Sequence, residues 1–98
     1  MRTVVLRDEG GLRVWATLHG GGSVSIEGQD LSGVFSWSEY EYAMTIAPSD
    51  VPRLVEALGG SEGDDVLDLL YQRRGDLRSE KSWLEEHEVP HDFWNRIE

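Results

Sequence analysis

The histidine and glutamate residues near the end of the chain are spaced like the ligands of a zinc protease. His87, Glu88 and His91 match H-E-x-x-H, in which two histidines one helical turn apart bind zinc and the glutamate is a general base. Pro90 lies between the histidines, and proline breaks a helix and pushes the preceding residue, Val89, out of the helical region. We therefore expect a helix–helix corner here, with diverging imidazoles and no bound metal.

A glycine-rich segment resembles two further kinds of functional loop. His19 and Gly20–Gly22 spell the oxyanion-hole loop of esterases, but the chain has no G-x-S-x-G nucleophile elbow and is too short for that fold. A phosphate-binding loop would precede a helix and a lysine, whereas a strand pattern follows these glycines. We interpret the segment as a hairpin turn and His19 as a strand-end residue.

Two clusters of carboxylates could bind calcium on chemical grounds: Asp30, Glu39 and Glu41, and Asp64, Asp65 and Asp68. Neither has the D-x-D-x-D-G spacing of a calcium loop, and acids in the second cluster suit the first turn of a helix. No nucleophile–base pair or metal-ligand set is visible in the sequence. We therefore predict that the chain is not an enzyme and needs no cofactor.

The charge of the chain indicates what it could bind. Its 98 residues include 19 acids and 9 lysines and arginines, for a formal net charge of −10. Such a field repels nucleic acid and anionic membranes and accelerates encounter with basic proteins. No lysine or arginine lies between Arg13 and Arg53, a stretch that also holds aromatic residues. Its acids are Glu27, Asp30, Glu39, Glu41 and Asp50.

The elements that position these residues follow from the hydrophobic pattern. The period-2 alternation of the first half predicts four strands joined by short, glycine-rich turns, which favours an antiparallel meander. These strands are Thr3–Arg7, Leu12–His19, Val24–Glu27 and Glu39–Ile46. Between the last two, Gly28–Ser38 is expected to be either a long loop or a loop with a poor strand around Val34–Trp37. The whole chain is expected to form one α+β domain, 1–98, with an N-terminal sheet of about four strands and three to four helices packed on one face.

The second half changes to helical spacing. Leu54 lies in the middle of an apolar stripe at i, i+3, i+4 and i+7 that starts at Val51 and ends before Gly59. Two further helices are expected at about 64–74 and 79–87, and Pro90 is expected to open a last short helical turn that carries Phe93, Trp94 and Ile97.

Four tryptophans are many for a chain of this length. Trp83 and Trp94 lie at helical core spacing, which predicts that they are packing residues. Trp15 lies on the strand face opposite the apolar residues, and Trp37 adjoins the irregular segment. Each of these two could anchor a partner or cover the edge of the core.

One family resemblance is carried by three segments of the chain. Gly28-Gln29-Asp30-Leu31, then Glu39-Tyr40-Glu41-Tyr42, and the helix at 50–58 resemble small acidic immunity proteins of bacteria, of the contact-dependent-inhibition or polymorphic-toxin type. The resemblance covers about residues 28–97. It implies a domain that occludes a basic toxin, often a nuclease, and it carries over no site residue.

Charge and resemblance together favour a protein-binding function with a basic protein as partner. The candidate partner-binding residues are Glu27, Asp30, Trp37, Glu39, Glu41 and Trp15. The alternative is an adaptor or structural subunit that pairs with itself or another protein through a sheet edge, and the chain could be a monomer or a homodimer. The absence of cysteine and the short apolar run before Arg7 lead us to expect a cytoplasmic protein.

Overall fold

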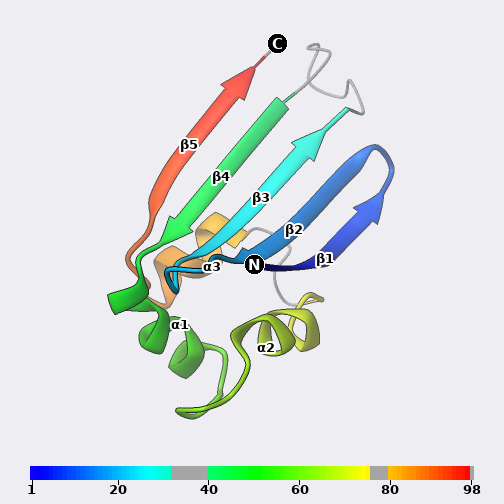
Figure 1. Ribbon diagram of the computed structural model, residues 1–98. Helices are drawn as coiled ribbons and strands as arrows, with labels where there is room; N and C mark the ends of the chain where they lie inside the picture. Colours follow the sequence, from blue (N-terminus) through cyan, green and yellow to red (C-terminus); the bar gives the residue numbers. More distant parts are fainter. Residues whose placement is uncertain (32–39, 76–79, 98) are drawn as a thin grey trace.

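The chain folds as an antiparallel sheet with three α-helices (Figure 1). The computed structural model describes residues 1–31, 40–75 and 80–97. In these ranges five strands follow one another across the sheet in sequence order. The strands are β1 (Arg2–Glu9), β2 (Leu12–Leu18), β3 (Val24–Asp30), β4 (Tyr40–Ile46) and β5 (Asp92–Ile97). The predicted α+β class and the antiparallel pairing of the first four strands are confirmed.

Glycines make the first turn of the meander possible. Gly10 and Gly11 connect β1 to β2 with φ values of 60° and 85°, a conformation that costs glycine little and other residues much. The next turn is closed by two backbone hydrogen bonds, from His19 N–H to the Ser23 carbonyl and from Gly22 N–H to the His19 carbonyl, both 2.9 Å long. The HGGG segment is therefore a hairpin turn, as predicted.

Strand β3 extends further along the chain than predicted. Gly28 and Gln29 belong to β3, which pairs with β4 as far as Asp30. Gly28 interrupts the apolar alternation that reveals a strand in the sequence, and the ring of Tyr42 on β4 lies over it: a Cβ atom at residue 28 would be 2.2 Å from Tyr42 Cζ. An aromatic side chain that covers a strand glycine restores the packing that glycine lacks.

This close approach predicts that Gly28→Ala destabilises the protein. The added methyl group must displace the Tyr42 ring, and overpacking of this kind costs about 1–3 kcal/mol in free energy of unfolding. Urea denaturation of the variant measures the loss. Gly21→Ala is the matched control, because a Cβ atom there meets nothing within 4 Å. Equal stabilities of the two variants would contradict the packing of Tyr42 over Gly28.

The three helices are α1 (Val51–Ala57), α2 (Val66–Gln72) and α3 (Glu80–Glu86), and a 3-10 turn, η1 (Pro48–Asp50), precedes α1. Helix α1 is followed by Gly59, whose positive φ of 80° is typical of a residue just past the end of a helix. Asp65 is the N-cap of helix α2, and its carboxylate accepts hydrogen bonds from the amides of Leu67 and Asp68 at 2.9 and 3.4 Å. Asp65 is thus a helix-capping residue, as predicted, and Asp68 lies in the first turn.

The expected C-terminal helical turn is wrong. Residues 92–97 form β5, which pairs with β4 at the edge of the sheet. The described residues hold three α-helices, within the expected three to four. The predicted packing role of Trp94 is wrong for the same reason: its side chain is 52% exposed. Trp83 does pack against the core, from α3.

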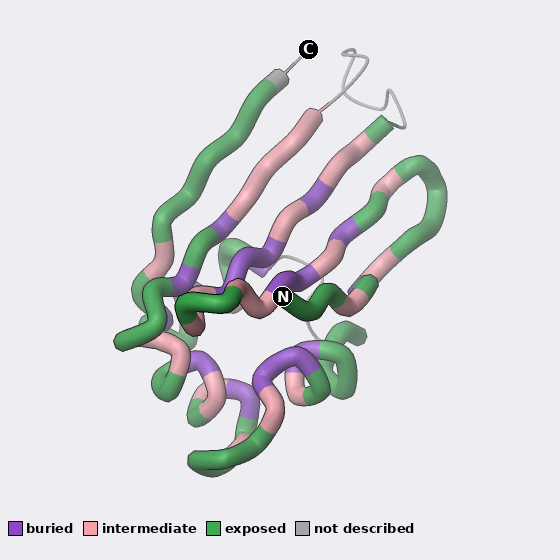
Figure 2. The backbone as a smooth tube through the Cα atoms, in the orientation of Figure 1, coloured by how far each residue is buried: buried purple, intermediate pink, exposed green. Residues whose placement is uncertain are grey.

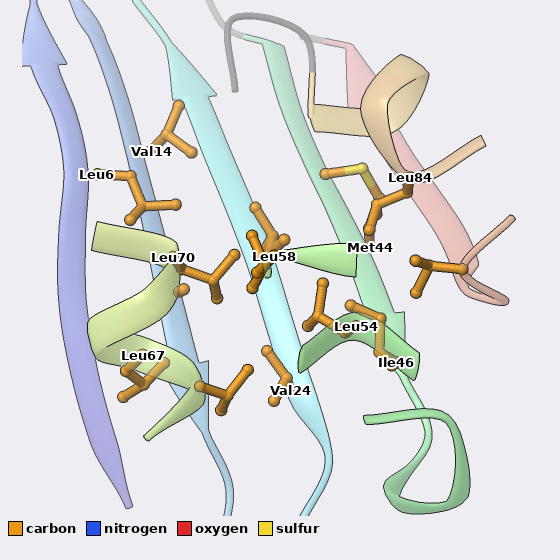
Figure 3. Close-up of a cluster of buried hydrophobic side chains, with 14 residues drawn as sticks. Leu6, Val14, Val24, Met44, Ile46, Leu54, Leu58, Leu67, Leu70 and Leu84 are labelled. Carbon is orange, nitrogen blue, oxygen red and sulfur yellow. The ribbon is translucent and has the colours of Figure 1, made fainter. Parts of the chain in front are cut away.

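One apolar core joins the sheet to the helices (Figure 3). Within β2, β3 and β4 the core residues occupy every second position, on one face of the sheet. The core residues from the helical half of the chain include Leu54, Leu58, Leu67, Leu70 and Leu84. Figure 2 shows that the buried positions gather toward the ends of the strands that lie nearest the helices. We refer to the face of the sheet that carries the core residues as the core face, and to the opposite side as the outer face.

A bulge in β1 adapts the core face to helix α3. The register between β1 and β2 shifts between Val5 and Arg7, so that Leu6 is an extra residue opposite β2. Leu6 is buried in the core, and Arg7 forms an ion pair with Glu80, the first residue of α3. Only 4% of the Glu80 side chain is exposed, and burial raises the pKa of its carboxyl group despite the attraction of Arg7.

Candidate functional site

The segment that resembles a zinc site forms a corner between helix and strand. Helix α3 ends at Glu86, and Glu88 adopts a positive φ of 55°. The Glu88 carbonyl accepts a hydrogen bond from Arg53 Nε (2.6 Å), and His91 Nδ1 lies 2.8 Å from the Val89 carbonyl. The predicted break of the helix at this segment is confirmed, so His87 and His91 do not share a helical face. The predicted helix–helix corner is wrong, because a strand, β5, follows α3.

The hairpin after β2 brings together a histidine and a serine that the sequence analysis did not pair. His19 Nε2 and Ser25 Oγ are hydrogen-bonded at 2.7 Å. The β2–β3 register places the two residues on the same face across the turn, so strand alternation could have revealed the pair. A Ser–His contact is also the first requirement of nucleophilic catalysis, but Ser25 is 93% buried within the strand. We interpret the contact as part of the hairpin.

A single row of side chains crosses the outer face of all five strands. Successive pairs in the register are Val5 with Trp15, Trp15 with Glu27, Glu27 with Ala43, and Ala43 with Trp94. Residues directly opposite each other on neighbouring strands lie side by side. The row therefore places Glu27 and Ala43 between two tryptophans, with Trp15 on one side and Trp94 on the other. We call these five residues the central row.

Two rows of different chemistry flank the central row. On one side, the register aligns residues with short polar side chains, mostly hydroxyls: Thr3, Thr17, Ser25, Thr45 and Asp92. On the other side it aligns charged and amide side chains: Asp8, Arg13, Gln29, Glu41 and Arg96. We call the second set the charged row. Among the described residues, these three rows together carry four carboxylates and two guanidinium groups.

Hydrogen bonds and an ion pair order these side chains. The indole N–H of Trp15 donates to Oε2 of Glu27 at 2.6 Å, which fixes the ring beside the carboxylate. The Glu41 carboxylate lies 3.7 Å from a guanidinium nitrogen of Arg96 and accepts from the Gln29 amide at 3.5 Å. Glu41 is therefore partly neutralised by its neighbours on the sheet.

The two tryptophans border a hollow in the outer face. Its volume is ≈290 Å³, and it is lined by Trp15, Glu27, Gly28, Gln29, Glu41, Tyr42, Ala43 and Trp94. Ala43 is among the lining residues, and its small side chain stands between Glu27 and Trp94 in the central row. We call this hollow the tryptophan slot.

The slot includes half of the residues proposed from the sequence as a binding surface. Glu27, Glu41 and Trp15 lie together on the outer face. Side chains along β3 alternate between the two faces of the sheet, and Asp30 falls on the core face, where its cross-strand partner is Tyr40. Trp37 and Glu39 lie outside the described residues.

Ala43 and Trp94 were missed as site residues. Trp94 was assigned to a helix because Pro90 and the apolar spacing at residues 93–97 resemble a helical turn, and only the pairing with β4 shows its true neighbours. The alternation of β4 does place Ala43 on the face of the strand away from Tyr42 and Met44, so this residue could have been found from the sequence.

A larger hollow, of ≈620 Å³, lies between α1 and the loop that follows it. Its lining includes the exposed acids Glu56, Glu62 and Asp64, of which Asp64 accepts a hydrogen bond from the Ser61 amide at 2.8 Å. Acids in a surface loop are commonly solvated, and none of the described residues that line this hollow is aromatic. The outer face is the better candidate because it combines aromatic and acidic groups.

The described residues hold no helix that is long and apolar enough to cross a membrane. Comparisons of the chain with models of known families, with curated proteins and with solved structures found no significant match. The function of the outer face must therefore be argued from its own chemistry.

Proposed function

We propose that the chain is a small acidic protein-binding domain without catalytic activity, and that its outer face docks a basic protein. In this arrangement the helices pack on the core face alone and leave the outer face to the partner. The observation that supports the proposal is the central row, in which Trp15 and Trp94 flank Glu27. Tryptophans surrounded by polar groups are typical of the residues that dominate the energy of protein interfaces.

The charge of the chain favours a basic partner over other classes. A net charge of −10 attracts cationic surfaces and opposes contact with nucleic acid or an anionic membrane, neither of which we propose as a partner. An immunity protein that neutralises a basic toxin, such as a nuclease, by occluding it would use a surface of this kind. The sequence resemblance favours that form of the function, in the cytoplasm of a bacterium.

An adaptor or structural subunit is the second candidate, and β5 is the observation that favours it. This strand has β4 as its neighbour on one side and ends the sheet on the other, and its residues Phe93 and Trp94 are 41% and 52% exposed. An exposed edge of this kind can pair with a strand of another chain. Light scattering over a range of concentrations tests it: a stable homodimer that binds no basic protein would favour the adaptor.

Charge reversal on the outer face should abolish binding to the basic partner. Glu27→Lys with Glu41→Lys adds four units of charge, from −10 to −6, within the proposed contact. Like charges placed across an interface cost several kcal/mol, so capture of the partner from a bacterial lysate should fall by at least tenfold. Quantitative mass spectrometry of the captured proteins measures the change, and circular dichroism checks the fold.

The matched control is Glu56→Lys with Glu62→Lys, which makes the same change in net charge on the helical side of the protein. It should retain most of the binding. A basic protein lost equally from both variants would show that net charge alone governs capture, and one lost from the control variant alone would place the contact on the helices. Either result contradicts docking at the outer face.

A further inference from the structure

Glu27 is a carboxylate at the centre of the outer face whose charge is not neutralised by the residues around it. Among the described residues its hydrogen-bond partner is the neutral indole of Trp15, and no lysine or arginine lies within ion-pair distance. Glu41, a carboxylate in the charged row beside it, differs because its charge is already paired with that of Arg96. An incoming cation would therefore find its counter-charge at Glu27.

The walls of the tryptophan slot also suit a cation. Trp15 and Trp94 stand three strand spacings apart, about 14 Å between their backbones. The face of an indole ring attracts cations, and of the three aromatic side chains tryptophan attracts them most strongly. Ala43 leaves the space between the rings open, since its side chain is a single methyl group.

The size of the slot indicates what enters it. At ≈290 Å³ it falls just below the usual range of pockets for small molecules and cofactors, about 300–1,000 Å³. It is large enough for one long side chain. Arginine fits the slot better than lysine, because a planar guanidinium stacks on an aromatic face while its N–H groups bind a carboxylate.

We propose that the tryptophan slot receives one arginine side chain of the basic partner, with Glu27 as its counter-charge and Trp15 and Trp94 as its walls. The inference rests on the proposed function and names the chemistry at the centre of that contact. The indole of Trp15 acts on the carboxylate as well as on the cation, because its hydrogen bond holds Glu27 in place before the arginine arrives.

The test uses short peptides that differ in a single side chain. The full-length protein, labelled with ¹⁵N, is titrated with acetyl-Gly-Arg-Gly-amide and with the same peptide carrying citrulline, which has nearly the same shape without the charge. The four tryptophans give four indole N–H signals, assigned with Trp→Phe variants. The arginine peptide should shift the signals of Trp15 and Trp94 and leave that of Trp83, which packs in the core, unchanged.

Binding of one side chain should be weak, with a Kd on the order of millimolar. The citrulline peptide should bind about tenfold more weakly, and so should the arginine peptide to Glu27→Gln, since a charged hydrogen bond is lost in each case. Glutamine keeps an acceptor for the Trp15 indole, so the slot keeps its shape. Glu62→Gln, a matched loss of one exposed acid, should leave the titration unchanged.

Three results would overturn the slot: equal shifts with the arginine and citrulline peptides, equal binding by Glu27→Gln, or no shift of the Trp15 and Trp94 signals. These results are distinct from failure of the docking proposal. If charge reversal abolishes capture of a basic protein while the peptide moves neither indole signal, the docking face stands and the arginine slot is wrong. If the peptide binds but no basic protein is captured, the slot stands and the docking proposal fails.

Discussion

Replacing Arg7 with methionine should lower the free energy of unfolding by about 3–5 kcal/mol at neutral pH, as removal of one partner of a buried ion pair does. Arg7 lies in the bulged part of β1 and holds the buried Glu80 carboxylate at the start of α3. Without the guanidinium, the carboxylate remains buried and loses the cation with which it is paired. Because methionine replaces the aliphatic part of the arginine side chain, the loss in free energy of unfolding comes mainly from removal of the charge.

This loss should depend on pH in a definite direction. Burial raises the pKa of Glu80 above its usual value, so the folded state binds a proton more readily than the unfolded state. The contribution of this group to stability is then fully present below the unfolded-state pKa and is lost as pH rises through the folded-state pKa. Removal of Arg7 raises the folded-state pKa further, because Arg7 lowers it. The cost of Arg7→Met should therefore be smallest in acid and grow toward neutral pH.

Urea denaturation between about pH 4 and pH 7 measures this dependence. Two controls separate charge from packing. Arg13→Met removes an exposed guanidinium from the outer face and should change stability by less than about 0.5 kcal/mol. Adding Glu80→Gln to Arg7→Met should recover much of the loss, because no buried charge then remains. A loss that does not vary with pH, or no recovery in the double variant, would contradict the buried pair.

Leu54→Ala should be the other severe substitution, with a loss of about 2–5 kcal/mol. Leu54 is fully buried in the middle of α1, within the core shared by the sheet and the helices (Figure 3). Truncation removes apolar contacts and leaves a cavity that the surrounding residues fill only in part. In a domain whose total stability is about 5–15 kcal/mol, the variant would lie close to unfolding.

The same substitution at Leu31 is the control, because that side chain is 55% exposed and should cost less than about 0.5 kcal/mol. Urea midpoints of the two variants and the wild type provide the comparison. If Leu54→Ala costs less than about 1 kcal/mol, α1 does not bury the face that the structure assigns to it.

The sequence was sufficient where a local pattern carries the information. Alternation located β2 and β4, and the i, i+3, i+4, i+7 spacing around Leu54 located α1 and its buried face. Glycines with positive φ marked the first hairpin, and Pro90 correctly marked the end of a helix. These signals act over a few residues, so they do not depend on what the rest of the chain does.

Long-range pairing explains what the sequence could not provide. Residues 92–97 form a strand because β4 offers an edge to pair with, and the short apolar run is also compatible with a helical turn. This one error removed Trp94 from the candidate site and added it to the core. Gly28 ended β3 too early in the prediction for a related reason, since the Tyr42 ring that compensates for it comes from another strand.

The sequence predicted an acidic candidate site and named three of the residues that line the tryptophan slot. Glu27, Glu41 and Trp15 share the outer face, as their parity on the strands implied, whereas Asp30 has the opposite parity. The face on which Asp30 lies follows from the alternation of β3 once Gly28 is included in the strand. The slot itself depends on β5 and could not be derived from local patterns.

The most direct test of docking at the outer face is the association rate with the captured basic partner, measured by stopped flow at low and high salt. Attraction between the acidic face and a basic surface speeds encounter, and salt screens it. We predict that the wild type associates at least tenfold faster in 10 mM than in 500 mM salt, and that Glu27→Lys with Glu41→Lys removes most of this difference while Glu56→Lys with Glu62→Lys retains it. Equal association rates for the wild type and the outer-face variant at every salt concentration, with both proteins folded, would contradict the account.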